Sequence, residues 1–439
     1  MHPSALTKVA AAVTLSIVGL GAAYAQSSVT LYGNLDVAFD HAHKGAGLQS
    51  IQGLGLPVPT AQNMNRVSPS ISSVNQFGFK GEENLGNGLK ASFVMEGEVR
   101  PDVGALNNDG RLFGRQIYAG LTTPVGEVRI GRQYAPMFYA YGLTTVDQLG
   151  ATDVFAGAIT ANNLQIRQDN QISYWVKSGP FLGELTYSPN AGVNSRVSAA
   201  RAVATSLPPA SSTTGEILGG ATAATESSSD RGRTYGLLLG YRTDAMTLTA
   251  AYHQNKFGVD VGLPTSPTTF LPLFALDKYQ GVVVAGKFTL PEAKTQLAVS
   301  YHWGDLDLTT ARDASLGSAT LNTVSMGVRQ PLDDKWSVGF EAAYSKFSNF
   351  TKGGDSAMVL IGDYQLSKRT ALYVRAGQTK DYRGSTAVAA SAVPGVTVIG
   401  GPLSGLASLG SLETPLFAGL GVNAGGRTSI AAIGIRHTF

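Results

Sequence analysis

The sequence has no cysteine and little charge. Of its 439 residues, 14% are charged and 43% are hydrophobic, and it has 17 Phe and 17 Tyr. The absence of cysteine excludes disulfide scaffolds, thiol catalysis and Cys-ligated metals. The low charge and high apolar content fit neither a disordered polymer nor a highly charged soluble fold. A formal net charge of +3 is too small to indicate a nucleic-acid partner.

Long apolar runs are also scarce. One stretch, residues 9–23, follows Lys8 and leads into Ala23-Tyr24-Ala25, the small residues of a signal-peptidase site. About 15 apolar residues are fewer than the ~20 that span a bilayer as a helix, which argues against an uncleaved anchor. We expect residues 1–25 to be a cleaved signal peptide and residues 26–439 to form a single domain. No later segment is a candidate membrane helix, so the exported chain is expected in the periplasm, the medium or the outer membrane.

Apolar and polar residues alternate along the rest of the chain. The pattern has a period of two and recurs at 29–39, 236–242, 296–303, 336–345 and 427–439. Each run has roughly ten residues, which is the length of a tilted transmembrane strand. One face of each run is apolar, and the other carries small and polar residues.

Connections between the runs alternate between two lengths. Short turns on one side and long loops on the other are typical of an outer-membrane barrel, and fifteen connections join sixteen strands. Seven are tight, with the Gly, Pro, Asn and Asp content of hairpin turns: residues 85–88, 124–126, 178–180, 244–245, 291–293, 331–335 and 367–370. Eight are longer: about 40–74, 100–111, 135–167, 189–232, 258–277, 307–320, 349–355 and 384–426.

A membrane environment requires the sheet to close. In hydrocarbon every backbone N–H and C=O needs a partner, so the last strand, 427–439, is expected to pair with the first. The predicted fold class is all-β: a transmembrane antiparallel β-barrel of 16 strands, with short periplasmic turns and long extracellular loops. The alternative is a secreted β-sandwich or propeller, but its outward face would have to be polar.

Five short motifs occur in order along the chain: Leu31-Tyr32-Gly33, residues 76–81, 118–121 and 130–134, and the terminal Arg436-His437-Thr438-Phe439. Together they resemble the Gram-negative trimeric general porins, most closely the beta-proteobacterial type, over essentially the whole mature chain. The resemblance implies a homotrimer in the outer membrane, surrounded by lipid and lipopolysaccharide, through which small hydrophilic solutes and ions diffuse passively. It also implies that Phe439 belongs to the signal read by the outer-membrane assembly machinery.

The resemblance further implies that the third long loop, about 135–167, folds into the lumen as a constriction. Three charges in more than thirty residues suit that placement, since few groups would lose hydration. Basic residues at matching wall positions would face this loop, and the loop aspartates would form the acidic counterpart. The predicted pore-constriction residues are Arg115, Arg132, Arg167, Lys80, Asp147 and Asp153.

Two departures from the family affect the predicted selectivity. Asn34 and Gln76 are neutral where family members often carry a basic residue, and the acidic Pro-Glu-Phe-Gly element of the enterobacterial third loop is missing. Three wall arginines against two loop aspartates predict a weak preference for anions. Because Arg115 shares its parity with the outward Ile117, we also expect a bulge or twist near the rim.

Other chemistries find little support in the sequence. Residues 281–288 resemble a phosphate-binding loop, but Phe288 replaces the Ser or Thr that would hold magnesium. His41 and His43 could chelate a metal together with a third ligand, but they lie at the start of a long polar loop and no cluster of Asp, Glu or Cys is near them. No G-x-S-x-G element occurs, so we expect no enzyme, no cofactor and no metal. The functional alternative is a substrate-specific channel, or a barrel whose loops bind a sugar, an organic acid or a host surface.

Overall fold

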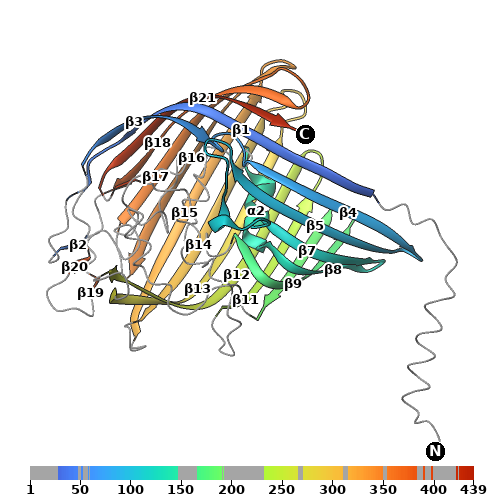
Figure 1. Cartoon of the computed structure of the whole chain (residues 1–439), viewed down its shortest axis with the longest axis horizontal. Coiled ribbons are helices and arrows are strands. Elements are labelled where there is room, and N and C mark those ends of the chain that lie inside the picture. Colours follow the sequence, from blue (N-terminus) through green and yellow to red (C-terminus); the bar gives the residue numbers. More distant parts are fainter. Residues whose placement is uncertain are drawn as a thin grey trace, which may run out of the picture.

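The chain folds as an antiparallel β-barrel whose strands follow one another around the wall (Figure 1). The computed structural model describes residues 28–47, 51–52, 58, 60–146, 166–189, 191, 232–264, 270–309, 315–349, 353–382, 389–390, 397–398, 422–423 and 425–439. The predicted signal peptide lies outside these residues.

The sixteen predicted strands are all present. They are β1 (Ser28–Lys44), β4 (Gln76–Gly86), β5 (Leu89–Arg100), β7 (Gln116–Thr123), β8 (Gly126–Tyr134), β9 (Arg167–Ser178), β10 (Phe181–Ser188), β11 (Arg233–Arg242), β12 (Met246–Pro264), β13 (Phe270–Thr289), β14 (Gln296–Thr309), β15 (Ser315–Pro331), β16 (Trp336–Asn349), β17 (Gly353–Gln365), β18 (Thr370–Tyr382) and β21 (Arg427–Thr438). The described parts of the longer loops contain β2 (Ile51–Gln52), β3 (Gln62–Pro69), β6 (Ala105–Leu106), β19 (Ala389–Ala390), β20 (Thr397–Val398), the 3-10 helix η1 (Asn108–Gly110) and the helix α2 (Pro136–Thr144).

The barrel closes where the two ends of the chain meet. Strand β1 pairs antiparallel with β21, from Asn34 opposite Thr438 to Lys44 opposite Thr428. Beyond that ladder, the Phe439 amide donates to the Gly33 carbonyl at 3.0 Å and the Gly33 amide donates to the Phe439 carbonyl at 3.1 Å. The expected closure is therefore confirmed, and the backbone groups of these two strands are satisfied as a membrane requires.

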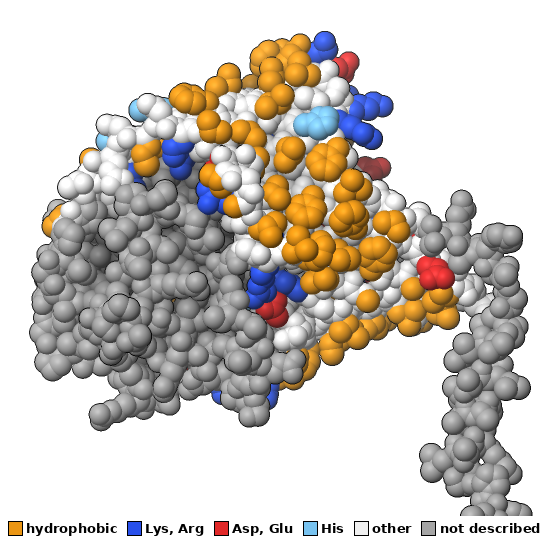
Figure 2. Space-filling model, viewed as in Figure 1, with side chains coloured by type: hydrophobic (Ala, Val, Ile, Leu, Met, Phe, Trp, Pro, Cys, Tyr) orange, Lys and Arg blue, Asp and Glu red, His pale blue; other side chains and the backbone are white. Residues whose placement is uncertain are grey.

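The outward face of the wall is apolar. Hydrophobic side chains gather on the outside of the strands (Figure 2), and Leu360, in the middle of β17, is 60% exposed. Aromatic pairs mark both ends of this part of the wall, with Trp336 against Tyr364 at 4.7 Å between ring centroids and Tyr344 against Tyr382 at 6.1 Å. An apolar band between two aromatic girdles is the surface that a barrel presents to lipid.

The seven tight turns lie where the sequence predicts them. In the first, Asn87 and Gly88 adopt positive φ angles of 52° and 78°, which Asn and Gly tolerate best. In the turn between β15 and β16, the Asp333 carboxylate accepts the amides of Lys335 at 2.7 Å and Trp336 at 2.6 Å. These two hydrogen bonds hold the pKa of Asp333 below its ordinary value.

Several predicted loops are instead extensions of strands. Strands β12 and β13 have 19 and 20 residues and pair as far as Pro264 opposite Phe270, within the loop predicted at 258–277. Likewise β3 pairs with β1 inside the loop predicted at 40–74. Backbone pairing does not need a lipid-facing side chain, so a hairpin can continue beyond the ten-residue band that alternation detects. Among the described residues, no helix is long and apolar enough to cross a membrane.

Candidate functional site

The described part of the third loop lies inside the barrel. Its helix α2 begins with Pro136, whose fixed φ and missing N–H suit the first turn, and it has no charged residue. The helix packs against the inner face of β11, β12 and β13, burying Met137, Ala140 and Tyr141. Burial raises the pKa of the Tyr141 phenol above its ordinary value, so this side chain stays neutral. The Ala135 amide donates to the Ile166 carbonyl at 3.0 Å and so closes the base of the loop.

Two glycines of the wall make room for this loop. A Cβ added at Gly236 in β11 would lie 2.8 Å from Pro136 Cγ, and one added at Gly327 in β15 would lie 2.7 Å from Val146 Cγ2. Both distances are shorter than carbon atoms tolerate. Absent side chains at these two positions therefore let the loop approach the wall closely.

The end of the described loop is fastened to the wall across the lumen. Glu341 on β16 accepts the Thr145 hydroxyl at 2.8 Å and the Val146 amide at 3.1 Å. Basic residues hold the loop's carbonyls, with Lys287 Nζ at 3.3 Å from the Thr145 oxygen and Arg329 Nη1 at 3.4 Å from the Val146 oxygen. A carboxylate and two cations from three strands thus fix where the loop crosses the lumen.

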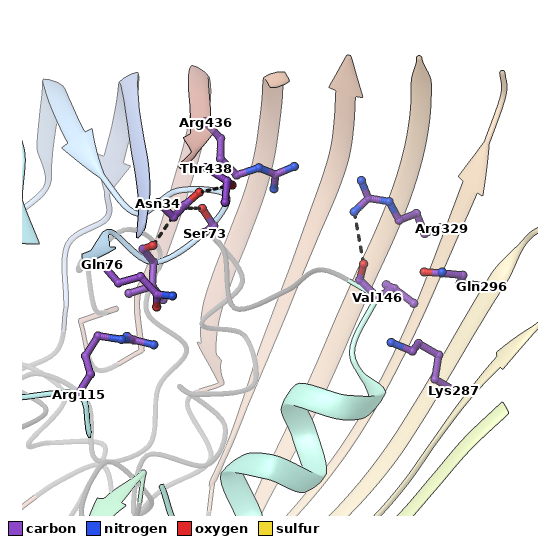
Figure 3. Close-up of a pocket in the computed structure, with 11 residues that line it drawn as sticks. Asn34, Ser73, Gln76, Arg115, Val146, Lys287, Gln296, Arg329, Arg436 and Thr438 are labelled. Atoms are coloured by element: carbon purple, nitrogen blue, oxygen red, sulfur yellow. Dashed lines mark hydrogen bonds between the residues drawn. The ribbon is translucent and has the colours of Figure 1, made fainter. Parts of the chain in front are cut away.

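A cavity of about 540 Å³ lies between this loop end and the opposite wall. In Figure 3, Val146, Arg329 and Lys287 face it from one side and Asn34, Ser73 and Arg115 from the other. None of the described residues that line it is acidic, and four are basic. The lining residues are Asn34, Ser73, Val74, Gln76, Arg115, Val146, Lys287, Gln296, Arg329, Arg436 and Thr438.

Arg115 lines this cavity but does not project from a strand. It lies just before β7 begins, and its guanidinium binds Glu96 Oε1 at 2.6 Å and Glu98 Oε2 at 3.1 Å. Arg115 stays hydrogen-bonded to β5, because its amide donates to the Glu96 carbonyl at 3.1 Å although the ladder pairs Glu96 with Gln116, so its side chain does not follow the parity of β7. The β8–β9 pairing has a register shift elsewhere, between Gly131 and Gln133.

The other predicted constriction residues occupy different surroundings. Arg132 Nη1 binds Asp169 Oδ1 at 2.6 Å, and Arg167 Nη2 lies 3.5 Å from Glu98 Oε2. Lys80 is exposed, with its ammonium 5.2 Å from the centre of the Tyr32 ring. These three are not among the described residues that line the cavity. Asp147 and Asp153 lie outside the described residues.

Three lining cations were not among the predicted site residues: Lys287, Arg329 and Arg436. The alternation predicts that all three point inward. Each lies an odd number of positions from an outward-facing residue of its own strand, namely Phe288, Met326 and Ile435. What alternation does not give is height along the strand. Many inward residues face the lumen, and only the position of the third loop decides which of them line the cavity beside it.

The ion pairs around the cavity leave a small positive excess within the described part of the chain. The group beside β5 and β9 holds four arginines against three carboxylates, namely Arg111, Arg115, Arg132 and Arg167 with Glu96, Glu98 and Asp169. On the far wall, Arg329 and Arg375 share the single carboxylate of Asp363. Each group has one more cation than anions, so the charge of this region is positive but largely compensated.

Comparison with known proteins identifies the family. The model of the Gram-negative porin family matches residues 9–384. The chain is 37% identical over 163 residues to outer membrane porin protein 32 of Delftia acidovorans, covering 35% of this chain and 42% of that protein. It is 31% identical over 170 residues to an outer membrane porin of Bordetella pertussis, covering 36% and 41%. These matched regions therefore span less than half of either relative.

Solved structures support the same fold. The anion-selective porin from Comamonas acidovorans matches with a TM-score of 0.60 and 21% identity, covering 94% of this chain and 100% of that one. A structure of OmpT from Vibrio cholerae described as a trimer form matches with a TM-score of 0.56 and 13% identity, covering 94% and 99%. The chain belongs to the Gram-negative porin family and is a multi-pass β-barrel protein of the outer membrane.

Proposed function

We propose that the protein is a water-filled channel for the passive diffusion of small hydrophilic solutes and ions, with a weak preference for anions. The observation that carries the proposal is the cavity beside the third loop, whose described lining has four basic side chains and no acidic one. Fixed cations at a narrow point raise the local concentration of anions and lower that of cations. The anion-selective porin of Comamonas acidovorans shares the fold, which is consistent with this direction.

The preference for anions is expected to be weak because carboxylates form ion pairs with two of the lining cations. Arg115 is shared between Glu96 and Glu98, and Arg329 is paired with Asp363. A nearby opposite charge cancels part of the field that a permeating ion meets beside the cation. Arg132, Arg167 and Lys80 are proposed to act from further away, as part of the same positive wall, with Asp147 and Asp153 as its acidic counterpart.

Reversal potentials in a salt gradient test the proposal. In the variant K287Q/R329Q/R436Q, three lining cations are removed, and we expect the permeability ratio to shift toward cations by roughly twofold or more. The matched control is K294Q/K335Q/K368Q, which removes the same charge from exposed turn positions and should keep the wild-type ratio. A wild-type ratio in the lining variant, or an equal shift in both, would contradict the proposal.

The same measurement on R115Q/R132Q/R167Q tests the constriction role proposed for these three arginines. Removing them leaves Glu96 and Glu98 without their arginine partners and leaves Asp169 with Arg111, so a shift toward cations is expected here too. If the permeability ratio of this triple variant equals that of the wild type, the arginines do not act in the constriction.

We further propose that the protein assembles as a homotrimer and that Phe439 belongs to its assembly signal. The trimer form of one structural relative supports the first part. For the second, the Phe439 side chain remains 39% exposed after the backbone has paired with Gly33, so it is available to an assembly factor. Native mass spectrometry of the detergent-extracted protein tests the trimer. Reduced outer-membrane yield of Phe439→Ala, with refolding in detergent unchanged, tests the signal.

A further inference from the structure

Residues 70–75 interrupt the second strand of the barrel and are here named the 70–75 insert. Strand β1 pairs with β3 up to Val37 opposite Pro69 and with β4 from Asn34 opposite Gln76. From the first pair to the second, β1 covers three residue positions, whereas the segment paired with it covers seven. Four residues therefore have no place in the ladder and must leave the wall on one side or the other.

The insert leaves the wall on the lumen side. Ile71, Ser72 and Asn75 are buried, while Ser73 and Val74 line the cavity described above. On the lipid side its unpaired amides would have no water to bind, which in hydrocarbon costs several kcal/mol per group. In Figure 3, Ser73 stands across the cavity from Val146, the end of the described third loop.

Buried Asp36 of β1 holds the insert in place. Its carboxylate accepts the Ser72 amide at 2.6 Å and also the amide of Ser73. Its backbone binds the Asn75 side chain twice, through the Asp36 amide to Oδ1 at 2.5 Å and through its carbonyl to Nδ2 at 2.9 Å. The Tyr373 hydroxyl from β18 donates to the same carboxylate. Such a network of charge-assisted bonds makes the insert a fixed part of the wall.

The insert also positions a cation of the cavity. The Ser72 hydroxyl accepts Arg375 Nη2 and Arg436 Nη1, each at 3.0 Å. Arg436 itself lines the cavity, beside Ser73. The chain segment that lines this side of the cavity thus also fixes the position of one of the cavity's positive charges.

We infer that the 70–75 insert is a second constriction element, facing the third loop, and that it sets both the width of the pore and the placement of Arg436. Ser73 and Val74 are its pore-lining residues, and Asp36 is its positioning residue. The inference rests on the proposed channel function. It adds to the constriction a wall that is encoded separately from the third loop, since the two segments share no residue.

Cysteine labelling tests the inference, because the chain has no native cysteine. In S73C and V74C the introduced thiol is the only one, and each is reacted with a negatively charged sulfonatoethyl or a positively charged trimethylammonioethyl methanethiosulfonate. We expect either adduct to lower single-channel conductance by at least about 1.5-fold. The negative adduct should shift the reversal potential toward cations, and the positive one should shift it toward anions. The control is S178C, an exposed position beside a tight turn, where full labelling should change neither quantity.

The outcomes separate this inference from the proposed function. Absence of ion conductance in the wild-type protein would refute the channel itself. If the wild-type protein conducts, and mass spectrometry finds S73C and V74C fully labelled with unchanged conductance, the insert does not narrow the pore. Failure of both thiols to react, while S178C reacts, would equally overturn it, because these residues would not be reached from the lumen.

Discussion

At the residue scale, the position of the third loop depends on single polar side chains of the wall. Glu341 accepts two hydrogen bonds from the loop end. The residues next to Glu341 in the sequence give no reason to expect this contact. The strand pattern shows only that Glu341 faces inward. Its role follows from Thr145 and Val146, which precede it by nearly two hundred residues.

Replacing Glu341 with Gln is expected to loosen the loop end. The neutral amide accepts the Val146 amide less strongly, and charge-assisted bonds of this kind contribute roughly 1.5–3 kcal/mol each. We expect more open-channel current noise and a lower unfolding temperature in detergent. The control is Glu292→Gln in an exposed tight turn, which removes the same charge away from the loop. Identical noise in the two variants would show that Glu341 does not fasten the loop.

At the element scale, alternation and turn chemistry predicted the strands because each of those signals is local. The same signals misjudged the lengths of β12 and β13, since pairing between two adjacent segments can continue after the lipid-facing pattern ends. They also missed the 70–75 insert. Its four excess residues become visible only when β3 and β4 are both aligned against β1.

The fit of α2 against the wall gives a prediction at this scale. In Gly236→Ala the added Cβ would lie 2.5 Å from Thr186 Oγ1 and 2.8 Å from Pro136 Cγ. The Thr186 hydroxyl can turn away but the proline ring cannot, so we expect the start of the helix to shift, altered conductance and a loss of about 1–3 kcal/mol of stability. Gly142→Ala in α2 is the matched control, since a Cβ there meets nothing within 4 Å. It should leave conductance unchanged and stabilise the helix by up to about 1 kcal/mol. Single-channel conductance and the free energy of unfolding in urea are measured for both variants. Equal values in Gly236→Ala and Gly142→Ala would show that the start of α2 does not pack closely against Gly236.

At the scale of the whole molecule, the barrel is stable only in a solvent that matches its outer face. Leu360 lies midway along β17. Four residues toward one end is Tyr364, which belongs to one girdle, and four residues toward the other end is Ser356, which hydrogen-bonds Tyr382 of the other girdle. This placement corresponds to the middle of the apolar band. A charge there has no route to water without distorting the bilayer.

Leu360→Lys is therefore expected to destabilise the folded barrel in lipid by about 2–4 kcal/mol. The control is Leu366→Lys in the following tight turn, also exposed, where the cost should be near zero to about 1 kcal/mol. Reversible unfolding by guanidinium in lipid vesicles measures both. Equal costs at the two positions would show that Leu360 does not face the hydrocarbon.

The sequence by itself determined the sixteen strands, their inward and outward faces, the tight turns and the closing pair, because period-two alternation and turn residues act over a few positions. It also carried the family motifs. Only the tertiary structure decided which charges line the cavity beside the third loop, including Lys287, Arg329 and Arg436, and that the 70–75 insert stands opposite the end of the described third loop. Height along a tilted strand depends on the register of every strand between, and that register is fixed only when the sheet closes.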